Sequence, residues 1–259
     1  MFDKTIGFIG SGRVTRIMLG GFRRAGETPR QIVVSDPNIE VLNSLEADFP
    51  EVTIAPNNNK GPAATDLVFV ALHPPAIKED LFQVVPSLKP GAVVISLAPK
   101  VSLKELSETL GGFQRIVRMN PNAPSIVNCG HNPVAFAPVF SSAEKTELSR
   151  IFQLLGACPE VPEENIEAYA ILTAMGPTYL WFQLYELIEL GISFGLSSQA
   201  IEAGISDMAK GAVTTMFESG LTPGQVMDLV PMKPLGADEE MIKSVYQGKL
   251  KAFYAKLKN

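Results

Sequence analysis

The chain has 259 residues, of which 46% are hydrophobic and 19% are charged, and its formal net charge is −5. This much apolar material can build a packed core, which excludes an intrinsically disordered chain. The acidic balance disfavours nucleic acid and anionic lipid as partners. The two cysteines, Cys129 and Cys158, stand outside any CxxC motif or Cys/His cluster, which disfavours a disulfide framework or a metal site.

No secretory or membrane-spanning segment is expected. The first residues lack the basic stretch and apolar core of a signal peptide. The longest apolar region, residues 171–196, is interrupted by Gln183, Glu186 and Glu189, which disfavours a membrane span. We therefore expect a soluble, cytoplasmic protein that holds no metal.

The first part of the chain alternates continuous apolar runs with amphipathic segments. The runs predict strands at residues 5–9, 31–35, 66–72 and 92–97, and further strands at 115–119 and 133–136. Strands without polar alternation are typical of a parallel sheet covered on both faces. Ser141 and Glu144 fit a capping box for a helix that runs to about Leu155. The alternation predicts an α/β fold with a doubly wound, Rossmann-type parallel sheet.

After about Pro162 the strand-like runs stop. One long helix is expected over 163–195, kinked at Pro177, followed by helices over 197–220, 222–229 and 239–257. Ser197 and Thr222 fit N-caps, and Gly220 fits a C-terminal stop. We therefore divide the chain into an α/β domain at 1–162 and an all-helical domain at 163–259.

The helix around residues 179–190 is apolar on most of its circumference. Its polar residues Gln183, Glu186 and Glu189 form only a narrow stripe. A helix of this kind must be buried on most sides. Because about 95 residues of helix form only a small core of their own, we expect a second subunit to cover it, and therefore a homodimer through the C-terminal helices.

A glycine turn between the first strand and the first helix indicates a dinucleotide site. Gly10 allows the tight turn, and Gly12 lets the backbone approach a pyrophosphate at the helix N-terminus. The third glycine of the G-x-G-x-x-G pattern is replaced by Thr15, so the context carries the assignment: a strand before, a helix after, and Asp36 ending the second strand. A carboxylate there would accept from ribose hydroxyls and repel a 2′-phosphate, which favours NAD(H) over NADP(H). The assigned cofactor-binding residues of the turn are Gly10, Ser11, Gly12, Arg13 and Val14.

Two later strand ends should border the nicotinamide half of the cofactor. In an open α/β sheet, ligands bind beyond the carboxyl ends of the strands. Leu72, His73 and Pro74 follow one such strand, and Ala98 follows the next. We assign His73 to capping or cofactor packing rather than to catalysis, and we assign no role to His131.

Over most of its length the chain resembles the pyrroline-5-carboxylate reductase family. The likeness rests on the segments IGFIGSGRV, VVISLAPKVSLKEL, RIVRMNPNAP, GPTYLWFQLYELIELGISFGLS and AKGAVTTMFESGLTPGQVMD. The resemblance implies a dinucleotide-binding domain at 1–162, a helical substrate and dimerisation domain at 163–259 that interlocks two subunits, and NAD(P)H as the cofactor. It also implies a part in reactions of the proline-biosynthesis type.

The departures from the family fall at the substrate site. Residues 173–175 read Thr-Ala-Met where the family has Ser-Gly-Ser, and residues 230–237 lack nearly all the hydroxyls of the family's Thr-Ser-Pro-Gly-Gly-Thr-Thr loop. Where the family strand ends in Met-Pro-Asn-Thr-Pro, Asn120 and Ala123 depart. A pocket that loses its donors should lose its former ligand. The candidate pocket residues are Thr173, Thr178, Asn122 and Lys233, the last as a point charge for a carboxylate. Either threonine would alternatively bond a backbone carbonyl one turn back, and Asn122 would form an Asx-turn.

Three hypotheses of function follow. The first is an NAD(P)H-dependent reductase of the C=N bond of a small cyclic imino acid. The sequence offers no obvious general acid, which suits an imine better than a carbonyl. The second is an NAD(P)-dependent oxidoreductase of another substrate class, such as a hydroxy acid or a deazaflavin cofactor, although residues 168–189 lack the lysine that β-hydroxyacid dehydrogenases use. The third is a dinucleotide-binding protein that does not catalyse.

Overall fold

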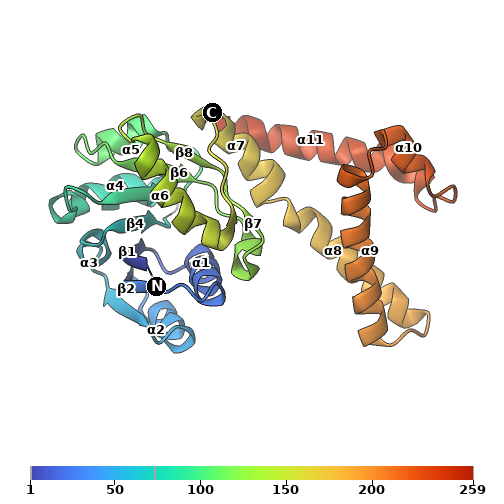
Figure 1. Cartoon of the computed structure of the whole chain (residues 1–259), viewed down its shortest axis with the longest axis horizontal. Coiled ribbons are helices and arrows are strands. Elements are labelled where there is room, and N and C mark those ends of the chain that lie inside the picture. The colour runs from blue at the N-terminus through green and yellow to red at the C-terminus, as the bar shows by residue number, and fades with distance from the viewer. Residues whose placement is uncertain (1, 73, 259) are drawn as a thin grey trace. The chain divides into compact units, whose positions relative to one another are not determined.

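The computed structural model describes residues 2–72 and 74–258, and the chain folds into two compact units (Figure 1). Unit 1 comprises Met1–Met175 and Tyr254–Asn259, and unit 2 comprises Gly176–Phe253. The domain boundary predicted at residues 162 and 163 stays a prediction. In the described part of the chain, no helix has the length and apolar composition that crossing a bilayer requires.

Unit 1 is a sheet flanked by helices. Its strands are β1 (Phe2–Ile9), β2 (Pro29–Asp36), β3 (Val52–Pro56), β4 (Leu67–Val70), β5 (Val93–Ser96), β6 (Ile116–Met119), β7 (Gly130–His131), β8 (Val134–Phe136) and β9 (Gly156–Ala157). Its helices are α1 (Arg13–Arg24), α2 (Ile39–Asp48), α3 (Lys60–Ala63), α4 (Pro74–Val84), α5 (Leu103–Thr109), α6 (Ser142–Phe152) and α7 (Ile166–Tyr169). Shorter turns are η1 (Val85–Ser87), η2 (Ala123–Val127), η3 (Gln153–Leu155), η4 (Glu163–Asn165) and the π-helical turn η5 (Ala170–Ala174).

The main sheet has the order β3-β2-β1-β4-β5-β6-β8. All neighbours pair in parallel except β8, which runs antiparallel to β6. β7 and β9 form a separate two-stranded parallel sheet. This order is that of a doubly wound Rossmann-type sheet, so the predicted fold class is confirmed. β3 and α3 were not predicted from the sequence.

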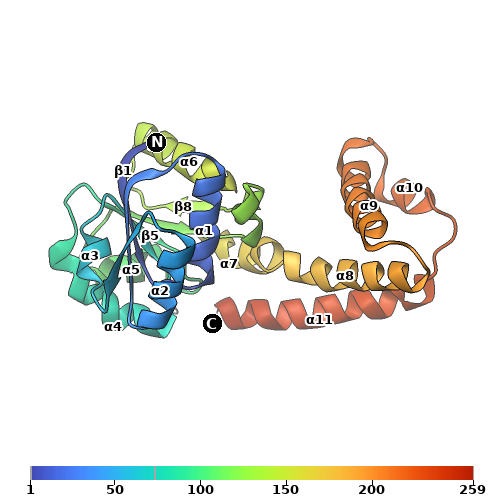
Figure 2. The same cartoon turned by 90° about the horizontal axis from the view of Figure 1, so that it is seen from below.

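Two apolar layers cover the sheet because successive strand residues point to opposite faces. Ile6, Phe8 and Phe69 face the cluster formed with α1, α2 and α6, whereas Ile9 and Val68 face the cluster formed with α3, α4 and α5. Figure 2 shows these two sets of helices on either side of the sheet.

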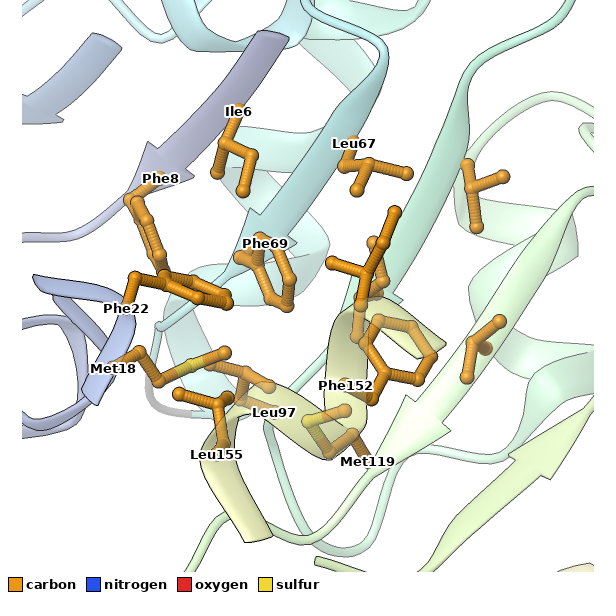
Figure 3. Packing of buried hydrophobic residues seen from close by; sticks show 14 of the residues in the cluster. Ile6, Phe8, Met18, Phe22, Leu67, Phe69, Leu97, Met119, Phe152 and Leu155 are labelled. Atoms are coloured by element: carbon orange, nitrogen blue, oxygen red, sulfur yellow. The ribbon is translucent and has the colours of Figure 1, made fainter. Parts of the chain in front are cut away.

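The rings of three phenylalanines form the centre of the first layer. Phe8 stacks on Phe69 with 5.0 Å between ring centroids, and Phe152 meets Phe69 edge-on at 6.4 Å (Figure 3). Met18, Phe22 and further core residues are labelled around them in the figure. This packing fixes α1, and therefore the loop that precedes it, against the sheet.

Unit 2 holds α8 (Pro177–Ser193), α9 (Ser198–Glu218), α10 (Pro223–Asp228), η6 (Gly236–Asp238) and most of α11 (Glu239–Lys258). Ser197 and Thr222 cap α9 and α10 as predicted, and Gly220 has φ +74° after the end of α9. The single helix predicted over 163–195 is wrong. The segment runs as η4, α7 and η5, and α8 begins at Pro177, which lacks the N–H that a helix interior needs.

Candidate functional site

The candidate site lies at the carboxyl edge of the sheet, where β1 has β2 on one side and β4 on the other. Chain connections leave this point in opposite directions, and ligands of open α/β sheets generally bind beside the loops at such a point. The loop after β1 is Gly10 to Gly12, and the loop after β4 begins with Ala71.

Gly10 is required by the close approach of these two loops. Its φ is +103°, and a Cβ on it would lie 2.6 Å from the Ala71 carbonyl oxygen. Its backbone N–H donates to the Ser35 carbonyl at 2.8 Å, which ties the loop to β2. Only glycine adopts this conformation at this distance without strain.

Gly12 leaves the N-terminus of α1 open. It is the N-cap residue at φ −68°, it contributes no side-chain cap, and a Cβ built on it would meet nothing within 4 Å. The amides of the first turn have no acceptor within the helix, and the helix dipole adds positive potential there. The exposed Arg13 adds a full positive charge at this end of the helix, where the dipole disfavours a cation unless an anion is bound. The turn therefore has the shape and charge for a phosphate group.

Thr15 takes the place of the fingerprint's third glycine without disturbing the turn. It is fully buried, and its hydroxyl donates to the Gly10 carbonyl oxygen at 2.7 Å. A buried threonine with its hydroxyl satisfied packs between helix and sheet at little cost. The incomplete sequence pattern therefore still gives the complete loop geometry.

Asp36 is bound to the same loop. One of its carboxylate oxygens accepts from the backbone N–H and from the hydroxyl of Ser11, each at 2.9 Å, and the other accepts from the Asn38 backbone N–H at 2.9 Å. Asp36 is half-buried, and each carboxylate oxygen has lone pairs left. Its predicted contact with ribose hydroxyls stays a prediction.

The other predicted cofactor residues follow β4 and β5. Leu72 is half-buried and Ala98 is buried, and both closely follow parallel strands at the same edge as Gly10. The backbone N–H of Leu97 donates to the Val70 carbonyl at 3.1 Å, which joins the two strand ends. Pro74 begins α4, and His73 lies outside the described residues.

The structure brings two of the four predicted pocket residues together. The Asn122 side-chain amide donates to the Thr173 carbonyl oxygen at 2.6 Å, and the Thr173 hydroxyl donates to the Tyr169 carbonyl oxygen at 2.9 Å. Asn122 is buried and Thr173 is half-buried, and both belong to unit 1. The back-bonded alternative considered for Thr173 is the one observed.

The other two predicted pocket residues, Thr178 and Lys233, belong to unit 2. Lys233 is exposed and lies at an apolar groove of about 850 Å³, together with Leu190, Leu235 and Ile242. The hydrogen bond from Lys243 to Glu239 lowers the pKa of Glu239, and the charge of Lys233 adds a smaller effect in the same direction. The role of Lys233 toward a substrate carboxylate stays a prediction.

A buried ion cluster that begins on β6 was not predicted from the sequence. Arg118 is 3% exposed and donates to Glu167 at 2.6 Å and to Glu163 at 3.1 Å, while its Nε has no partner among the described residues. A lone arginine within the apolar run of residues 116–119 was the available signal, since charges are almost never fully buried unless paired. The cluster ties η4 and α7 to the sheet.

These observations define a Rossmann-type architecture with an open helix N-terminus at the switch point of the sheet, followed by a C-terminal helical unit. A family model described as "NADP oxidoreductase coenzyme F420-dependent" matches residues 5–100. The chain is similar to the pyrroline-5-carboxylate reductase of Escherichia coli (strain K12), with 25% identity over 93% of this chain and 89% of that protein. The predicted resemblance to pyrroline-5-carboxylate reductases is confirmed.

Solved structures give the same result for the fold. A pyrroline-5-carboxylate reductase from Coxiella burnetii matches with 26% identity and a TM-score of 0.71, covering 99% of this chain and 95% of that one. A pyrroline carboxylate reductase from Plasmodium falciparum, solved with NADP bound, matches with 20% identity and a TM-score of 0.82, covering 100% and 98%. The likeness therefore extends through the C-terminal helices.

Proposed function

We propose that this chain is an NAD(P)H-dependent reductase of the C=N bond of a small cyclic imino acid related to pyrroline-5-carboxylate. The observation that carries the proposal is the open first turn of α1, in a chain similar over 93% of its length to a pyrroline-5-carboxylate reductase. An N-terminal Rossmann fold alone is compatible with many reactions. Similarity to a pyrroline-5-carboxylate reductase that continues through the helical unit narrows the class of reaction.

The residues of the β1–α1 turn fit a dinucleotide. The amides that open α1, from Gly12 to Val14, would hold the diphosphate, and the Asp36 carboxylate would accept from ribose hydroxyls. The same carboxylate would repel a 2′-phosphate, so we propose a preference for NADH. Leu72, His73, Pro74 and Ala98 would border the nicotinamide end because they follow β4 and β5.

When bound, NAD(P)H supplies a hydride from C4 of its nicotinamide ring. The protonated imine carbon accepts that hydride, its C=N bond becomes a C–N bond, and the nitrogen keeps its proton and gains a lone pair. The product amine then takes a proton from water. Because the iminium nitrogen already carries its proton and the carbon is electrophilic, the protein has only to position the substrate and needs no general acid at the nitrogen.

We propose a substrate-binding role for Thr173 in unit 1 and, separately, for Thr178 and Lys233 in unit 2, with Lys233 attracting the carboxylate of the substrate. The loop over residues 230–237 lacks the hydroxyls of the resembled family, so one cation would replace several neutral donors. The cation would still recognise the negative charge of the ligand's carboxylate, but the binding site would have a different shape. The substrate is therefore related to pyrroline-5-carboxylate without having to be identical to it.

We further propose a homodimer formed through the C-terminal helices, in the cytoplasm. Leu180, Phe182 and Tyr185 of α8 are 56%, 67% and 68% exposed in the single chain. Apolar patches of this kind mark interaction surfaces. Two free cysteines, one exposed and one buried, suit a reducing compartment.

The test is a turnover assay on the purified full chain. NADH or NADPH would be mixed with pyrroline-5-carboxylate and a panel of other cyclic imines, and oxidation of the reduced nicotinamide would be followed by absorbance. We expect substrate-dependent oxidation with at least one imine. Failure across the panel, with nucleotide binding intact by calorimetry, would rule out imine reduction.

One observation favours a second candidate, an NAD(P)-dependent oxidoreductase of another substrate class. The family model that matches residues 5–100 describes NADP oxidoreductases that depend on coenzyme F420. The match covers the nucleotide-binding part and ends before the helical unit. Turnover with a deazaflavin or a hydroxy acid, and none with cyclic imines, would establish this candidate in place of the first.

A further inference from the structure

The chain segment that carries Thr173 has an irregular backbone. It passes from the α-helical turn α7 to the π-helical turn η5, in which the Met175 N–H donates to the Ala170 carbonyl at 3.0 Å. π-helical turns are rare and occur often at functional sites. Such a turn needs support from elsewhere in the fold, because its backbone bonds do not follow the regular pattern.

Asn122 supplies that support. Pro177 has no N–H, so the residue four places after Thr173 cannot donate to the Thr173 carbonyl as it would in an α-helix. The Asn122 amide donates to this oxygen instead, at 2.6 Å. Asn122 is held from the sheet side, since its backbone N–H donates to the side-chain oxygen of Asn132 at 2.8 Å and Asn132 is 1% exposed.

Neighbouring side chains hold the same segment at other points. Asn120, two residues before Asn122, donates to the Ile166 carbonyl at 3.1 Å. That carbonyl also accepts the N–H of Ala170 within the helix, so the bond from Asn120 is not its sole support. Asn120 departs from the motif of the resembled family and bonds a different carbonyl, which makes it a matched control for Asn122.

The Thr173 hydroxyl has a fixed hydrogen-bonding direction. A backbone carbonyl has no hydrogen, so the bond between the Thr173 hydroxyl and the Tyr169 carbonyl uses the hydroxyl proton. The oxygen is then left with lone pairs only and acts as an acceptor toward any ligand. A carboxylate has no proton to offer it, whereas a protonated imine nitrogen has one.

We infer that the Thr173 hydroxyl recognises the N–H of the protonated imine rather than the carboxylate, and that Asn122 is the positioning residue that holds it in place. This inference rests on the proposed function. The N–H of the substrate donates to the Thr173 oxygen before the hydride transfer, and the same nitrogen still carries that hydrogen in the product amine.

The first test compares ligands with and without the N–H. Thr173→Val removes the hydroxyl at constant shape, and Thr173→Ser keeps it. For the wild type, kcat/KM with pyrroline-5-carboxylate should exceed that with its N-methyl iminium analogue, and Thr173→Val should reduce this ratio roughly tenfold. Thr173→Ser should keep it. A ratio equal in Thr173→Val and Thr173→Ser would overturn the inference.

A binding measurement gives a readout without turnover. By calorimetry, proline should bind the wild type more tightly than tetrahydrofuran-2-carboxylate, whose ring oxygen lacks both the N–H and the positive charge, and Thr173→Val should reduce the difference while Thr173→Ser keeps it. Equal affinities in the wild type would contradict the inference. If the wild type reduces no imine, both the proposed function and the inference are wrong. If the wild type reduces an imine but the ratio of kcat/KM values is the same in Thr173→Val, only the inference is wrong.

The second test concerns Asn122. Asn122→Asp places a carboxylate oxygen against the Thr173 carbonyl, so kcat/KM for the imine should fall about tenfold or more while the Kd for NADH stays unchanged. Amides of residues 170–175 should exchange hydrogen faster. Asn120→Met should stay within about threefold of the wild type in kcat/KM. Equal losses in both variants, or an equal loss of NADH affinity, would show a merely structural role.

Discussion

Ser11 donates both its backbone N–H and its hydroxyl to one carboxylate oxygen of Asp36, each at 2.9 Å. The bond joins the glycine turn after β1 to the end of β2, in the register that pairs Ile9 with Ser35. Asp36 therefore supports the loop that would hold the diphosphate and is also a candidate for ribose recognition. These two roles can be separated by mutation.

Replacing Asp36 with Ser should shift the cofactor preference toward NADPH. The carboxylate would repel a 2′-phosphate, and a like-charge contact at about 4 Å is worth about 1 kcal/mol in bulk water and more near a protein surface. The ratio of Kd values for NADH and NADPH, measured by calorimetry, should change about tenfold. Ser11→Ala keeps the charge and should leave the ratio near its original value. An unchanged ratio in Asp36→Ser would show that the ribose assignment is wrong.

Gly12→Ser should weaken dinucleotide binding without weakening the fold. A Cβ at this position meets nothing within 4 Å, and serine is a better N-cap than glycine. The thermal midpoint should therefore stay equal or rise, while the new hydroxyl bonds the amides that the diphosphate needs. We expect NADH affinity to fall about tenfold or more by calorimetry.

Gly10→Ala is the contrasting variant. Its Cβ would lie 2.6 Å from the Ala71 carbonyl at φ +103°, so it should lower the free energy of unfolding by roughly 1–3 kcal/mol. Thermal melting followed by circular dichroism should show a lower midpoint for Gly10→Ala and an equal or higher midpoint for Gly12→Ser. If Gly12→Ser bound NADH as tightly as the wild type, the open helix N-terminus would not be the nucleotide site.

Low pH should lower the free energy of unfolding of unit 1 through protonation of Asp66. Burial raises the pKa of this carboxyl, but hydrogen bonds from Lys89 and from the backbone and hydroxyl of Thr5 outweigh it and hold the pKa at about 2, below the ordinary 3.8. Because the folded pKa is the lower one, the stabilisation is complete above pH 3.8 and is lost as the pH falls toward 2.

The variant Asp66→Asn should show this dependence. At neutral pH it should be less stable than the wild type by roughly 1 kcal/mol, because the carboxylate is partly solvated. Between about pH 5 and about pH 2 its free energy of unfolding should fall less steeply than that of the wild type. Urea titrations across this range measure both quantities. Parallel curves for the two proteins would mean that Asp66 contributes nothing to the acid response.

The nucleotide-binding part could be predicted because its signals are local. A strand, a turn with Gly10 and Gly12, and a helix lie within residues 5–24, and each element has its own composition. The bond between Ser11 and Asp36 could not be predicted, since it depends on the register of β1 against β2. The structure also shows why Thr15 is tolerated, because its hydroxyl reaches the Gly10 carbonyl.

The contact between two of the candidate pocket residues could not be predicted from the sequence. Asn122 and Thr173 lie 51 residues apart in the sequence, and no hydrophobic periodicity predicts their contact. The interruption before Pro177 was mistaken for a kink because α7 and η5 both carry helical composition. A π-helical turn leaves no signal in hydrophobic spacing, so only the folded structure reveals which carbonyl needs a donor.

The exposed face of α8 makes assembly testable by a paired substitution. Phe182 and Tyr185 are 67% and 68% exposed in the single chain, and they stand three residues apart on the helix. If a second copy covers them, Phe182→Ser with Tyr185→Ser should convert the dimer to a monomer, measured by light scattering after gel filtration. Phe82→Ser is the matched control, because Phe82 is 68% exposed but lies on α4 in unit 1. A wild type that is monomeric at micromolar concentration, or a dimer that survives the double substitution, would remove α8 from the interface.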